Sequence, residues 1–89
     1  MSNFALVCNY EFDYGMKLLQ VDSENTIGEV IQIARDGIAG VFVAEPEPGV
    51  VLKLRKYGTT EFLDENLKIS ETGFKQAETI EIIHVYPKA

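Results

Sequence analysis

One amphipathic helical segment, with two apolar alternating segments before it and two more after it, leaves few folds open to this chain. Thr26-Ile27-Gly28-Glu29 has the spacing of a capping box, in which the threonine hydroxyl accepts from the third helical N–H and the glutamate reaches back. We expect the helix to stop at Gly37 or Gly40. Because its apolar stripe has to be covered, the helix requires a second layer. The stripe consists of Ile27, Val30, Ile31, Ala34 and Ile38.

The segments on either side of this helix have the composition and the alternation of β-strands. They span residues 4–10, 16–21, 50–56 and 79–86, and residues 61–63 fit a short edge strand. Residues 64–74 are rich in turn formers, and Pro87 is expected to end the last strand. The side chains predicted to face the core from the strands and the turn-rich segment are Phe4, Leu6, Cys8, Tyr10, Leu52, Leu54, Leu67, Ile69, Phe74, Ile80 and Ile82.

A hairpin, a capped helix and a return through further strands predict an α+β fold of the β-grasp type. In this fold one helix packs on a mixed sheet, here of four to five strands. Chains of 89 residues rarely divide and still leave each part enough apolar surface to bury, so we expect one domain over residues 1–89.

The charge balance narrows the choice of partners. Fourteen acidic and 8 basic residues give a net charge of −6, which repels phosphate backbones and anionic lipid headgroups. We therefore expect no nucleic-acid and no membrane partner. The single cysteine and the absence of a signal-peptide pattern or a long apolar run indicate a cytoplasmic protein.

The sequence offers little that could carry out chemistry. Cys8 is interpreted as an inert small hydrophobe in the first strand, and His84, the only histidine, as a structural residue. One cysteine and one histidine do not complete a zinc site, and the carboxylates lack the spacing of a calcium loop. We therefore predict no catalytic, cofactor-binding or metal-binding residue in this chain.

The outward side of the predicted sheet is the remaining candidate for function. Three of the eight basic residues cluster there beside apolar Val51, and Val7 is also expected to face outward. One interpretation is an ordinary solvated face, and the other is a docking surface for a larger acidic protein. The candidate partner-binding residues are Val51, Lys53, Arg55, Lys56, Ile83 and Val85.

Several segments carry a resemblance to known proteins. Residues 21–30, 67–74 and 78–83 resemble the strand-to-helix passage and the closing segment of ubiquitin-like proteins. The chain as a whole resembles the small gamma subunit, also called the B subunit, of bacterial toluene and related aromatic monooxygenases. This resemblance rests on Tyr10-Glu11-Phe12-Asp13, Val43-Ala44-Glu45-Pro46, the basic strand at 49–56 and Ile69-Ser70-Glu71-Thr72-Gly73-Phe74.

The resemblance implies a single ubiquitin-like domain that acts as a non-catalytic subunit of a multicomponent hydroxylase. It further implies binding to a large alpha subunit that carries a carboxylate-bridged diiron centre, with a beta subunit alongside. In this family a Rieske-type ferredoxin, a reductase and an effector protein complete the system, which inserts one oxygen atom into an aromatic ring or an alkene.

Two other functions remain open from the sequence. A free-standing ubiquitin-like interaction module could use the same sheet face to hold another partner. A sulfur carrier or conjugated modifier would need a C-terminal Gly-Gly, whereas this sequence reads Val85-Tyr86-Pro87-Lys88-Ala89, so we do not expect covalent transfer.

Overall fold

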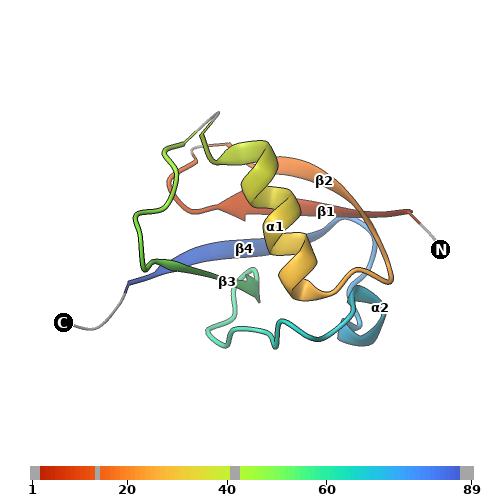
Figure 1. Ribbon diagram of the computed structural model, residues 1–89. Helices are drawn as coiled ribbons and strands as arrows, with labels where there is room; N and C mark the ends of the chain where they lie inside the picture. The colour runs from red at the N-terminus through yellow and green to blue at the C-terminus, as the bar shows by residue number, and fades with distance from the viewer. Residues whose placement is uncertain (1–2, 14, 41–42, 87–89) are drawn as a thin grey trace.

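The computed structural model describes residues 3–13, 15–40 and 43–86. The elements follow in the order β1 (Asn3–Tyr10), β2 (Lys17–Asp22), α1 (Ile27–Ile38), β3 (Val51–Lys56), α2 (Ile69–Thr72) and β4 (Glu78–Val85). The strands form one sheet in the order β2-β1-β4-β3. Strands β1 and β4 are parallel, and the two outer pairs are antiparallel. Figure 1 shows α1 lying across one face of this sheet, which confirms the predicted helix-on-sheet α+β fold.

Helix α1 begins as the sequence predicts. The backbone N–H of Glu29 donates to the Thr26 hydroxyl at 3.2 Å, and the N–H of Thr26 donates to the Glu29 carboxylate at 2.8 Å. This second hydrogen bond lowers the pKa of Glu29 below its usual value because it favours the ionised carboxylate. Every residue of the predicted apolar stripe is buried.

Three local expectations are wrong or incomplete. Gly37 lies inside α1 and does not end it, and the chain turns away only at Gly40, which has a φ of +79°. Residues 61–63 form no strand, although the N–H of Leu63 donates to the Leu54 carbonyl at 2.9 Å. The short helix α2, which was not predicted, occupies part of the turn-rich segment, and Gly73 follows it with a φ of +80°. The expected end of the last strand at Pro87 lies outside the described residues.

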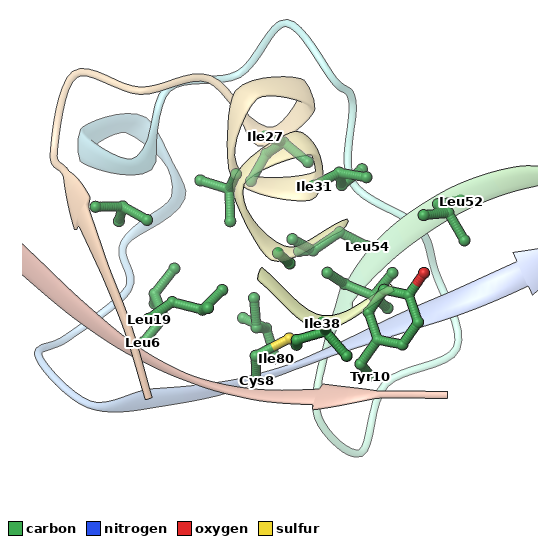
Figure 2. Close-up of a cluster of buried hydrophobic side chains, with 14 of the residues drawn as sticks. Leu6, Cys8, Tyr10, Leu19, Ile27, Ile31, Ile38, Leu52, Leu54 and Ile80 are labelled. Atoms are coloured by element: carbon green, nitrogen blue, oxygen red, sulfur yellow. The ribbon is translucent and has the colours of Figure 1, made fainter. Parts of the chain in front are cut away.

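The core lies between α1 and the sheet. Figure 2 shows the aliphatic side chains of α1 facing side chains from the strands, with the ring of Tyr10 at one end of the cluster. Alternation in the strands puts every second side chain into this layer, as predicted. The buried strand residues are Leu6, Cys8, Tyr10, Leu19, Val21, Leu52, Leu54, Ile80, Ile82 and His84.

Candidate functional site

The sheet face opposite α1 carries a small aliphatic area at the end of β3 and β4. The antiparallel register places Val51 opposite Val85 and Lys53 opposite Ile83. Val51 and Val85 are 47% and 37% exposed, so the predicted outward orientation of both valines is confirmed. We call the set Val51, Lys53, Arg55, Ile83 and Val85 the β3–β4 patch.

Lys56 is not part of this face, which corrects the expected cluster of three basic side chains. It lies opposite Ile80, a buried residue on the α1 side of the sheet. Because side chains alternate along a strand, Lys56 follows Leu52 and Leu54 to that side. There its ammonium group lies 3.7 Å from the Glu78 carboxylate.

The two basic residues of the β3–β4 patch are paired within the chain. Lys53 Nζ lies 3.2 Å from the Glu65 carboxylate, and Arg55 Nε lies 3.0 Å from the carboxylate of Glu81 on the neighbouring strand. The Arg55 guanidinium also lies 5.9 Å from the centre of the Phe62 ring. The patch therefore presents aliphatic side chains beside neutralised charges, and not the free cations that the sequence suggested.

Cys8 is buried in the first strand, as predicted. Burial, with a smaller contribution from the negative charge of Asp13, raises the pKa of its thiol to about 12. The thiolate is the reactive form of cysteine, so this residue is unsuited to nucleophilic chemistry.

His84 is held at the end of β4 by one carboxylate. Strand β1 ends at Tyr10, and the backbone N–H of His84 donates instead to Oε1 of Glu11 at 2.6 Å. The same oxygen lies 3.0 Å from Nδ1 of the imidazole, and because an ionised carboxylate only accepts, the tautomer that fits this contact has the Nδ1–H group donating a hydrogen bond to Glu11. The Tyr10 ring packs edge-on against the imidazole at 5.5 Å. His84 therefore stabilises the end of the sheet, in agreement with the structural role predicted for it.

The described residues do not fit a metal centre. Within the ranges 3–13, 15–40 and 43–86, no three His, Cys, Asp or Glu side chains come together in a way that could hold a metal ion. These described residues therefore do not fit an iron centre of the kind that the sequence resemblance associates with the large subunit. In the same ranges, no helix combines the length and the apolar character needed to cross a membrane.

A hollow of about 230 Å³ lies on the α1 side of the sheet, where β4 ends beside the connection from α1 to β3. No local sequence pattern indicates this hollow, because its walls come from three distant segments. The one usable signal was an aromatic residue, Phe12, within a turn. The walls are formed by Phe12, Ala44, Glu45, Pro46, Glu47, Val50, His84 and Tyr86.

Comparison with known proteins gives one family. The family model described as toluene-4-monooxygenase system protein B matches residues 3–84. No individual curated protein sequence matches the chain significantly.

Solved structures with a similar fold were also found. A chain from a structure of the toluene 4-monooxygenase HD complex with the inhibitor 4-bromobenzoate is 27% identical, with a TM-score of 0.84 over 91% of this chain and 96% of that chain. Two further structures share the fold alone. A ubiquitin of Caldiarchaeum subterraneum is 13% identical, with a TM-score of 0.67 over 99% of this chain and all of its own. A chain from a study of molecular mimicry of SUMO in DNA repair is 16% identical, with a TM-score of 0.69 over 93% of this chain and 92% of its own.

Proposed function

This chain belongs to the family of toluene-4-monooxygenase system protein B, and we propose that it is the small, non-catalytic subunit of a hydroxylase that acts on aromatic hydrocarbons or alkenes. The observation that carries this proposal is the similarity to a chain of the toluene 4-monooxygenase complex, which extends over nearly the full length of both chains. This chain has a ubiquitin-like fold that can offer a surface to a partner, and its described residues include no group suited to catalysis.

We propose that the catalytic iron belongs to a large alpha subunit, as a diiron centre, and that a beta subunit completes the hydroxylase. The chemistry of this chain supports that division, because its thiol is buried and its imidazole is bound to Glu11. Its contribution is then to bind the large subunit and to support the geometry of that subunit. We also propose that the complex works in the cytoplasm, where a lone thiol remains reduced.

The β3–β4 patch is our candidate for the surface that contacts the large subunit. Val51, Ile83 and Val85 supply an apolar centre, and the ion pairs of Lys53 and Arg55 supply a polar rim, which is the usual layout of a protein interface. No charge has to be left unpaired when this surface is covered, since both cations already have carboxylate partners. The interface is therefore expected to depend on its aliphatic side chains more than on electrostatic attraction.

The test is reconstitution of the hydroxylase with variants of this chain. Large and beta subunits of the proposed hydroxylase are purified with and without the small subunit, and complex formation is measured by size-exclusion chromatography and titration calorimetry. We expect Val51→Asp together with Val85→Asp to prevent assembly, because two carboxylates would have to be desolvated at the centre of the interface. Both side chains are exposed in the free chain, so its melting temperature should change little.

Leu18→Asp provides the control, because Leu18 is also aliphatic and exposed, at 63%, but lies on the edge strand β2. This variant should assemble like the parent chain. The proposed function would be wrong if the large subunit is folded and fully active without this chain, and the chain elutes alone at every concentration. If the Val51→Asp/Val85→Asp variant assembles normally, the docking face lies elsewhere although the subunit role stands.

A further inference from the structure

The hollow at the end of β4 has walls of unusual composition for a surface depression. Phe12 and Tyr86 form its aromatic sides and are 60% and 56% exposed. The imidazole of His84 also lines the hollow, with its ring centre 4.8 Å from that of Phe12 and 6.5 Å from that of Tyr86. Water-exposed aromatic rings gathered around one hollow are typical of binding surfaces, where they supply large and rigid contact areas.

The backbone of Phe12 makes this exposure more informative. The residue has a φ of +77°, a conformation that is unfavourable for a bulky side chain, in the turn closed by the hydrogen bond from Asp13 N–H to the Tyr10 carbonyl. A glycine would occupy this position without strain. The strained turn presents a ring that is mostly in water, so burial within the chain does not explain why phenylalanine stands there. Strain of this kind is common where a side chain is held ready for a ligand.

The carboxylates in the wall of the hollow indicate that its ligand is positively charged. Glu45 and Glu47 lie in its wall, and no ion pair involves Glu47 within the part of the chain that the structure describes. Glu45 lies 3.5 Å from Arg35, and both of these side chains are well exposed. Aromatic faces beside a carboxylate attract a cation, since the ring quadrupole and the carboxylate charge act in the same direction. A guanidinium group suits such walls best, because it stacks flat on a ring while its N–H groups donate to a carboxylate.

The size of the hollow limits the ligand to one side chain. Its volume of about 230 Å³ is below the range of roughly 300 to 1,000 Å³ that is usual for pockets holding whole small molecules. Its position suggests the source of that side chain. Val50 and Tyr86 line the hollow on the α1 side, whereas their chain neighbours Val51 and Val85 lie in the β3–β4 patch on the opposite face. A partner that covers the patch can therefore reach the hollow around the end of the sheet.

We propose that this hollow is a socket for an arginine side chain of the hydroxylase large subunit, held between Phe12 and Tyr86 and paired with Glu47. The proposal rests on the subunit role stated above. Arginine and aromatic residues are also the side chains that most often dominate the binding energy of interfaces. The socket would thus anchor the complex while the β3–β4 patch excludes water beside it.

The test measures the dissociation constant between the parent chain or its variants and the purified hydroxylase subunits. Phe12→Gly removes the ring and also relieves the strained backbone, so the melting temperature of the free chain should not fall while the complex weakens at least tenfold. Ala77→Gly is the matched control, since Ala77 also has a positive φ, of 63°, and does not line the hollow. This control should bind like the parent chain.

Glu47→Gln tests the carboxylate separately, with Glu61→Gln as the matched control at an exposed acid outside the hollow. Glu47→Gln should weaken binding several-fold and reduce its dependence on salt, and Glu61→Gln should do neither. The socket would be refuted if the parent chain binds the hydroxylase and both Phe12→Gly and Glu47→Gln bind as tightly. If the parent chain itself does not bind, the subunit role fails first and the socket fails with it, so the two failures are distinguishable.

Discussion

Tyr10→Phe should stabilise this protein, which is an unusual expectation for a substitution in a core. The Tyr10 side chain is 0% exposed, and its hydroxyl has no hydrogen-bond partner among the described residues. Burial raises the pKa of this phenol, so the hydroxyl remains protonated under ordinary conditions. Figure 2 shows the hydroxyl oxygen directed away from β1 at the end of the cluster. Within the part of the chain that the structure describes, this buried hydroxyl has therefore lost its water without gaining a hydrogen-bond partner in its place.

The magnitude follows from that loss. An unsatisfied buried hydroxyl costs about 1 to 3 kcal/mol, and removal of one oxygen atom forfeits only part of this through poorer packing. We therefore expect the free energy of unfolding to rise by about 1 kcal/mol. In a chain of 89 residues this corresponds to an increase of about 4 to 8 °C in the melting temperature.

The assay is thermal and urea unfolding of the isolated chain, followed by circular dichroism. Tyr57→Phe is the matched control, because Tyr57 is 52% exposed and its hydroxyl remains in water in both states. That variant should melt within experimental error of the parent chain. A lower melting temperature for Tyr10→Phe would refute the reasoning, because it would mean that the buried hydroxyl makes a stabilising interaction.

Three further predictions concern the core. Ile82→Ala, at a fully buried position on β4, should lower the free energy of unfolding by about 2 to 5 kcal/mol through the cavity it leaves, measured by urea denaturation. Cys8 should react with a disulfide reagent only as fast as the chain unfolds, which parallel measurements of labelling and of unfolding rates can check. Its pKa rises from 9.0 to about 12 on folding, so above pH 9.0 the unfolded chain binds fewer protons than the folded one. The contribution of Cys8 to the free energy of unfolding is therefore fully present below pH 9.0 and is lost progressively above it. One pH unit above 9.0, the free energy of unfolding should have fallen by about 1.4 kcal/mol, and Cys8→Ala should not show this fall.

The elements with strong local signals could be predicted from the sequence. The capping box at Thr26 and the stripe that follows it specify α1 through contacts between near neighbours, and strict alternation specifies the inward faces of the strands. Helix α2 was missed because its four residues are too few to show a helical period. Its start is held by the hydrogen bond from the N–H of Lys68 to the Glu71 carboxylate at 2.9 Å. The N–H groups of Ile69 and Ser70 also donate to the carbonyls of Asn25 and Ser23, which lie far away in the sequence.

The candidate surface could be predicted only in part, for a related reason. Alternation alone gave the outward direction of Val51 and Val85. The pairing of Arg55 with Glu81 depends on the register between β3 and β4, and the register is a property of the assembled sheet. The hollow combines the turn at Phe12, the connection before β3 and the end of β4, so no local pattern in the sequence could have revealed it.

The pairing of β1 with β4 has a consequence for how this protein is made. These two strands are the central neighbours of the sheet, yet they are the first and the last of its described strands in sequence order. When the ribosome has synthesised β1, β2 and α1, strand β1 still lacks β4, one of its two neighbours in the sheet. The β1–β2 hairpin cannot pair with β4 until Val85 has left the exit tunnel. The sheet therefore cannot be completed before β4 has been synthesised, and a nascent chain cut short before β4 lacks the strand that pairs with both β1 and β3.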